Sequence, residues 1–132
     1  DADIWGVAVQ EMVETGKEVI LGVTKDPTFG HMLMFGLGGI YVEVLKDVVF
    51  RIAPLTRREA EEMVRSIRSF PLLAGVRGEK PVDLDALVEC ILRISQLVTD
   101  FPQIVELDIN PLFAYETGKG SIAVDARIVI GE

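Results

Sequence analysis

The 132 residues suffice for one domain with a single hydrophobic core, and 49% of them are hydrophobic. A net charge of −8 argues against nucleic-acid binding, which needs a basic surface, and against an anionic membrane surface. No apolar run approaches the roughly 20 residues that cross a bilayer. The acidic start, Asp1-Ala2-Asp3, is unlike a signal peptide, and the single cysteine, Cys90, favours a reducing, cytoplasmic setting.

The first half of the chain is predicted to form an antiparallel sheet, because short β-rich runs alternate with small turns. Strands are expected over residues 7–13, 17–24, 29–35, 40–45 and 48–52. Asp26-Pro27 is expected to begin a reversal, and Lys46-Asp47 is expected to form a hairpin tip. The first of these strands is already under way at the start of the chain, so we expect a fragment or one half of a larger site.

Two helices are predicted next. Thr56 and Glu59 have the spacing of a capping box, and apolar residues recur at helical period after them until Phe70-Pro71 ends the pattern. Asp83 is placed to cap a second helix that stops near residues 100–102. Strands, two helices and then strands predict an α+β domain, a largely antiparallel sheet with two helices packed on one face.

Two acidic strands near the C-terminus are the most informative part of the sequence. Because side chains alternate along a strand, Glu106, Asp108 and Asn110 share the face opposite Val105, Leu107 and Ile109. A chain reversal around Thr117-Gly118 places Asn110 opposite Asp125 and Asp108 opposite Arg127.

Two interpretations of this acidic pair of strands are open. Mg²⁺ prefers one or two carboxylates together with substrate phosphates, which Asn110 and Asp125 fit. The alternative is a solvated strand face with an ion pair between Asp108 and Arg127, contributing at most about 1 kcal/mol.

Other candidates carry weaker signals when taken alone. Residues 36–39 (Gly-Leu-Gly-Gly) have no helix predicted after them, so a turn is favoured over a phosphate-binding loop. Gln10 to Val13, followed by Glu18, suit an adenine edge and ribose hydroxyls, although an ordinary turn is the simpler interpretation. His31 lacks a catalytic partner at a telling spacing and is predicted to be a partly buried strand residue.

Several segments together resemble one family over nearly the whole chain. They are Gln10–Val13, Asp26–Gly30, Met34–Ile40, Val42–Asp47, Ala53–Leu55 and Glu106–Leu112. The chain is similar to the C-terminal half of the ATP-grasp domain of the nucleoside-diphosphate-forming acyl-CoA synthetases. These include acetate–CoA ligase (ADP-forming) and, more distantly, the β subunit of succinyl-CoA synthetase.

The resemblance implies an activity and a set of site residues. Such ligases interconvert an acyl-CoA, ADP and phosphate with a free acid, CoA and ATP, and a phosphohistidine in another segment carries the phosphoryl group. The positions that match the family's sites are, for magnesium, Asn110, Asp125 and the nearby Asp108; for adenine, Gln10, Glu11 and Val13; for ribose, Glu18; and near the phosphates, Gly38 and Gly39.

The expected partners follow from what this sequence does not contain. The preceding ATP-grasp lobe, with its phosphate-covering basic residues, and the CoA-binding subunit or domains are missing, so the chain is expected to bind ATP poorly by itself. His31 stands where many relatives carry proline and is not the phosphohistidine. Two alternatives remain: a non-catalytic, ligand-sensing or architectural module of an acetyltransferase fusion, and an ATP-grasp ligase that does not use CoA.

Overall fold

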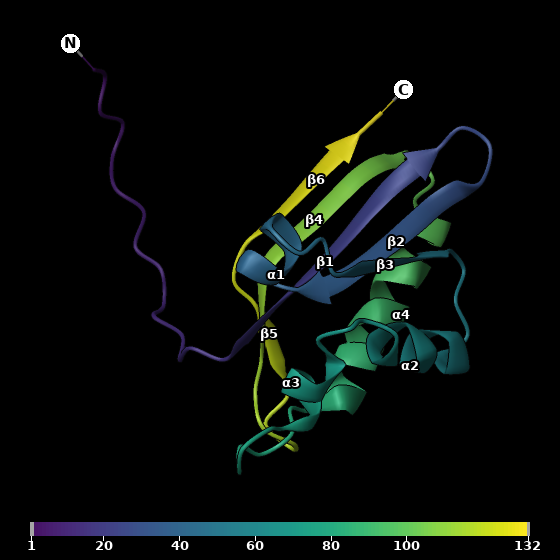
Figure 1. The fold of residues 1–132 in the computed structure, drawn as a ribbon. Helices are drawn as coiled ribbons and strands as arrows, with labels where there is room; N and C mark the ends of the chain where they lie inside the picture. Colours follow the sequence, from purple (N-terminus) through teal and green to yellow (C-terminus); the bar gives the residue numbers. More distant parts are fainter. Residues whose placement is uncertain (1, 132) are drawn as a thin grey trace.

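The computed structural model describes residues 2–131, and its centre is a six-stranded antiparallel sheet (Figure 1). The strands are β1 (Lys17–Asp26), β2 (Gly30–Leu37), β3 (Val48–Ile52), β4 (Ile104–Ala114), β5 (Ser121–Ala123) and β6 (Ala126–Ile130). Their order is β3-β2-β1-β4-β5, and β6 also pairs with β4. The long strands β1 and β4 therefore lie side by side in the middle, with the acidic row on β4.

Four helices accompany the sheet: α1 (Ile40–Glu43), α2 (Arg57–Arg65), α3 (Phe70–Ala74) and α4 (Leu84–Asp100). The predicted capping box begins α2, since Thr56 accepts from the amide of Glu59 and Glu59 accepts from the amide of Thr56. Asp83 caps α4 by accepting from the amide of Ala86, as predicted. Both helix starts thus follow from local hydrogen bonding of short polar side chains.

The core lies between one face of the sheet and helices α2 and α4. Alternate residues of β1, β2 and β4 point into it and are fully or almost fully buried, with apolar residues of the helices against them: Val19, Leu21, Val23, Leu33, Phe35, Leu107, Met63, Val64, Leu87, Ile91 and Val98. The α+β prediction, with two helices on one face, is confirmed. The other face of the sheet is called the open face below.

Helix α1 was predicted as a strand, and this expectation is wrong. The run from Ile40 to Leu45 turns into a helix that lies against the open face at the end of β2. A Cβ on Gly36 would be 3.2 Å from Val42 Cγ2 and 2.8 Å from the carbonyl oxygen of Asp47, so only glycine permits this close approach. Ile20, the neighbour of Gly36 across the sheet, is buried.

Two turn predictions also fail. Asp47 is not a hairpin tip: it is buried, and its carboxylate accepts the amides of Arg68 and Ser69 at 2.8 and 2.7 Å. Phe70-Pro71 does not end a helix but begins α3, where Pro71 stands in the first turn and therefore needs no hydrogen-bonded amide. The carboxylate of Asp47 thus joins the α1–β3 corner to the start of α3.

Residues 2–16, called the arm below, form no strand, so the expected strand over 7–13 is not present. The arm runs away from the sheet (Figure 1) and is exposed from residue 2 to residue 12. Its apolar side chains are among the most exposed in the protein, with Trp5 at 98% and Met12 at 94%. Within residues 2–131, no helix is long and apolar enough to cross a membrane.

Candidate functional site on the open face of the sheet

The structure brings the three predicted magnesium ligands to one region of the sheet. Asp108 on β4 pairs in register with Arg127 on β6, and the amide of Asn110 donates to the carbonyl oxygen of Asp125 at 3.1 Å. Both pairings are those predicted from the turn around Thr117-Gly118. Asn110 and Asp125 are exposed, and Asp108 is half-buried.

The side-chain oxygens of Asp108, Asn110 and Asp125 have no hydrogen-bond or ion-pair partner among the described residues. The alternative interpretation paired Asp108 with Arg127, but the guanidinium of Arg127 contacts Glu106, its diagonal neighbour on β4. Within residues 2–131, no three His, Cys, Asp or Glu side chains gather closely enough to hold a metal by themselves. Two carboxylates and one amide oxygen fit Mg²⁺ only when phosphates supply further oxygens.

A hollow of about 230 Å³ lies beside Glu106 and Asp108 on the open face. Its floor is Gly22 on β1, which pairs with Asp108 on one side and with Met34 on the other. Met34, Met32 and Phe50 make the opposite wall apolar, while Glu106 and Asp108 make the near wall acidic. The open face therefore offers an apolar surface next to free carboxylate oxygens.

Glu18, Gly38 and Gly39 lie together at the other end of the open face. The amide of Gly38 donates to the carbonyl oxygen of Glu18 at 2.7 Å, and a Cβ on Gly38 would be 2.9 Å from Glu18 Cβ. Gly39 has a φ of 64°, a conformation that favours glycine. With Ile40 and Tyr41 they border a cavity of about 330 Å³, and the carboxylate of Glu18 is exposed.

The predicted adenine contacts, Gln10, Glu11 and Val13, lie in the arm and are not brought against the other site residues. Gln10 and Glu11 are exposed, and Val13 is half-buried. The structure thus places the candidate magnesium ligands and the candidate ribose and phosphate residues on or beside the sheet. The candidate adenine contacts lie on the arm, which reaches away from the sheet.

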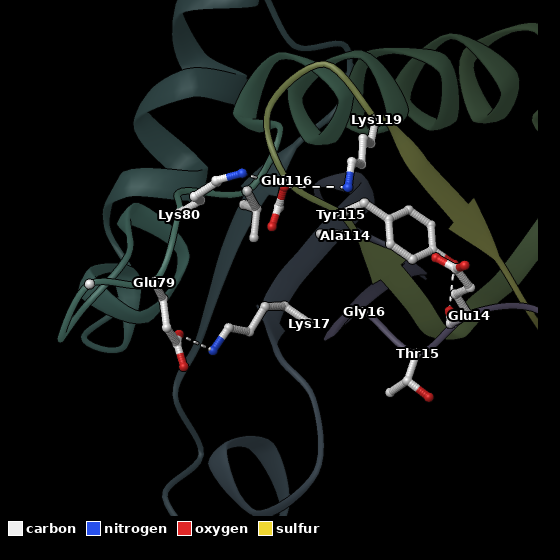
Figure 2. Close-up of a pocket in the computed structure, with 12 residues that line it drawn as sticks. Glu14, Thr15, Gly16, Lys17, Glu79, Lys80, Ala114, Tyr115, Glu116 and Lys119 are labelled. Atoms are coloured by element: carbon white, nitrogen blue, oxygen red, sulfur yellow. Dashed lines mark hydrogen bonds and ion pairs between the residues drawn. The ribbon is translucent and has the colours of Figure 1, made fainter.

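Tyr115 is a residue near this site that the sequence did not single out. It follows β4 directly, and its hydroxyl donates to the carbonyl oxygen of Glu14 at 2.7 Å (Figure 2). Beside it, Glu116 is 3.3 Å from both Lys80 and Lys119, whose hydrogen bonds lower the pKa of the Glu116 carboxyl. No sequence pattern marks Tyr115, because its partner is a backbone oxygen 101 residues away.

His31 has the structural role predicted for it, and Cys90 is likewise a structural residue. His31 is buried on β2, and its Nε2 lies 2.6 Å from the carbonyl oxygen of Ile104. Cys90 is partly buried against the core in α4, with its Sγ 3.3 Å from Ser121 Oγ. Neither residue borders the open-face hollow.

Comparisons with known proteins agree with this arrangement. The chain is 54% identical over 130 residues to the "Acetate--CoA ligase [ADP-forming] I subunit beta" of Pyrococcus furiosus, covering 98% of this chain and 55% of that protein. It is 56% identical over 127 residues to the "4-hydroxybutyrate--CoA ligase [ADP-forming]" of Nitrosopumilus maritimus, covering 96% of this chain and 18% of that protein. The chain thus spans about half of the first relative.

A solved structure has the same fold. The acetyl-coenzyme A synthetase 1 of Ca. Korarchaeum cryptofilum, crystallised with coenzyme A and Mg-AMPPCP, superposes with a TM-score of 0.86 at 42% identity. The match covers 92% of this chain and 56% of that chain. The sequence profile of the ATP-grasp domain matches residues 1–130, and with the sheet, helices and open face described above it shows that the chain belongs to the ATP-grasp domain family.

Proposed function

We propose that this chain is the nucleotide-binding part of an ADP-forming acyl-CoA synthetase. Such an enzyme interconverts an acyl-CoA, ADP and phosphate with a free acid, CoA and ATP. The observation that carries the proposal is the set of unpartnered oxygens of Asp108, Asn110 and Asp125, of which Asp108 borders a partly apolar hollow. The names of relatives that are more than half identical support the same reaction class.

In this proposal Asn110 and Asp125 hold Mg²⁺, and Asp108 lies close to it. A bound Mg²⁺ neutralises charge on nucleotide phosphates, which phosphoryl transfer requires more than covalent help from the protein. Asn110 on β4 is joined by a backbone hydrogen bond to Asp125 in the link between β5 and β6, so the two backbones are held together before any ligand arrives. A backbone fixed in advance lowers the ordering free energy of binding relative to ligands on a mobile loop.

The remaining assignments follow the outline of the open face. The exposed carboxylate of Glu18 accepts ribose hydroxyls, and Gly38 and Gly39 let the neighbouring backbone approach the nucleotide. Backbone groups of Gln10, Glu11 and Val13 meet adenine. These residues lie on the arm, so adenine binding requires a partner that orders it.

The partners in this proposal are the other ATP-grasp lobe and the CoA-binding domains or subunit, which carry the phosphohistidine. Exposed Trp5, Val7 and Val9 support a further lobe, because apolar side chains more than 85% exposed are ordinarily covered in the complete protein. The segment 7–13, whose composition predicts a strand, would then pair within that lobe. We place the enzyme in the cytoplasm, where CoA thioesters and reduced cysteine coexist.

Titration calorimetry of Mg-ADP tests the proposal in the complete protein with both lobes. Asn110→Ala together with Asp125→Ala is expected to weaken Mg-ADP binding at least tenfold and to abolish ATP formation while leaving the fold intact. The control is Asp100→Ala, which removes an exposed carboxylate at the far end of α4 and should leave binding unchanged. A folded wild-type protein that does not bind Mg-ADP would refute the proposal and favour a non-catalytic module.

A further inference from the structure

Tyr115 joins the arm to the end of β4. Its hydroxyl donates to the carbonyl oxygen of Glu14 at 2.7 Å, and its ring lies against Gly16 (Figure 2). A Cβ on Gly16 would be 2.7 Å from the carbonyl oxygen of Ala114 and 3.1 Å from the Tyr115 ring. The absence of a side chain at residue 16 therefore brings the arm and the end of β4 together.

The hydrogen bond from Tyr115 to Glu14 is what attaches the arm to the folded domain. Within residues 2–131, it is the only hydrogen bond between residues 2–15 and the remainder of the chain. The next brace, the ion pair of Lys17 with Glu79 at 2.7 Å, joins half-exposed side chains and is worth little. The direction in which the arm leaves the sheet thus depends on one hydroxyl and one glycine.

A large cavity lies beside the hydrogen bond between Tyr115 and Glu14. A cavity of about 690 Å³ borders Glu14, Gly16, Lys17 and Tyr115 on the side of the sheet that carries the helices. An open cavity leaves room for the arm to swing, and no packed side chain replaces the hydroxyl if it is removed. Lys80 and Lys119 across the cavity are already engaged with Glu116.

We propose that Tyr115 is a positioning residue for the nucleotide: it fixes the arm so that Gln10–Val13 meets adenine while Glu18 meets ribose. The inference rests on the proposed function, because it assigns Tyr115 a role in the same site. Glu14 directly follows Val13 and stands four residues before Glu18, so anchoring its carbonyl group sets the spacing between the two contacts. Tyr115 does not touch the nucleotide in this proposal.

Tyr115→Phe is the sharpest variant, because it keeps the ring against Gly16 and removes only the hydroxyl. A neutral hydrogen bond contributes about 0.5–1.5 kcal/mol, and because this one is exposed the low end applies, which corresponds to roughly a twofold to threefold effect. We expect the KM for ADP to rise by about that factor in the complete enzyme, with kcat and the KM for the acyl-CoA unchanged. The matched control is Ser66→Ala, which removes another hydroxyl that donates to a backbone carbonyl, at the end of α2.

Backbone order parameters of residues 14–16 from NMR relaxation, measured without nucleotide, separate this inference from the proposed function. Tyr115→Phe should lower these order parameters, and Ser66→Ala should not. Unchanged order parameters would overturn the anchoring contact, and lower order parameters with an unchanged KM for ADP would overturn the positioning role. If the wild-type enzyme binds no Mg-ADP, the proposed function fails and the positioning role fails with it, even where the order parameters confirm the contact.

Discussion

Asp47 is predicted to be one of the most important polar side chains for stability. Its buried carboxylate accepts two amides, from Arg68 at 2.8 Å and from Ser69 at 2.7 Å, and links the start of β3 to α3. A hydrogen bond to a charged group contributes about 1.5–3 kcal/mol, and Asp47→Asn keeps one neutral acceptor while losing the charge. We expect this variant to lower the free energy of unfolding by about 2–3 kcal/mol at neutral pH.

The pH dependence gives the prediction its sign. Burial opposes ionisation of Asp47, but hydrogen bonds from Ser69 and Arg68 outweigh it and lower the pKa below 3.8. A carboxyl whose pKa is lower in the folded state stabilises the fold above the unfolded pKa and loses that contribution as the pH falls through the folded value. The stability difference between the wild type and Asp47→Asn should therefore close in acid.

Urea unfolding followed by circular dichroism is the assay, because the 132-residue chain contains a core of its own. Asp26→Asn is the control: Asp26 also accepts two amides, from Thr28 and Phe29, but in an exposed turn. Its loss should stay below about 1 kcal/mol, since water replaces the lost bonds. Equal losses for the two variants, or a difference that persists in acid, would refute the reasoning.

Two further predictions concern thermal unfolding of the same chain. Asp83→Ala should lower the free energy of unfolding by about 1–3 kcal/mol, because Asp83 caps α4 and also accepts the amides of Gly118 and Gly120 at 2.9 and 3.1 Å. A loss under about 0.5 kcal/mol would contradict this link between the helix and the hairpin. Gly36→Ala should lower the free energy of unfolding by about 1–3 kcal/mol, since its Cβ meets the Asp47 carbonyl oxygen at 2.8 Å. Gly22→Ala should lower it less, because the nearest atom to its Cβ is the flexible end of Met34 at 3.3 Å and the nearest backbone atom is at 3.6 Å. Equal melting temperatures for the two glycine variants would contradict the steric argument.

The features predicted correctly from sequence are those that local chemistry determines. The capping box at Thr56 and the cap at Asp83 need only neighbouring amides, and both formed as predicted. The register of β4 with β5 and β6 from Ile109 back to Glu106 and on to Ala114 follows from one turn, and it shifts only between Glu106 and Ile104. Asn110 beside Asp125 was therefore accessible to sequence reasoning.

The features that were missed depend on residues far apart in the chain. Ile40, Val42 and Val44 alternate with the period of a strand, yet the chain forms helix α1, which packs on the open face over Gly36, beside the buried Ile20. Asp47 resembles a turn residue until its partners, 21 and 22 positions later, are known. Arg127 pairs with Glu106 and not with Asp108, because a long arginine side chain reaches its diagonal neighbour as easily as the residue opposite.

The charge of the open face explains why the proposed site must be completed by other parts. Glu18, Glu106 and Asp108 are acidic, and Arg127 is the only cation at the outward positions of β1 to β4 and β6 in the described chain. Since Glu106 already engages Arg127, this face repels a phosphate chain in the absence of a metal. In the proposed site, Mg²⁺ held by Asn110 and Asp125 would offset the charge of Asp108 and Asp125 without making this face positive, so the proposal needs cations from a second lobe. If Tyr115 positions the arm as proposed, the arm belongs to the nucleotide site together with the metal ligands.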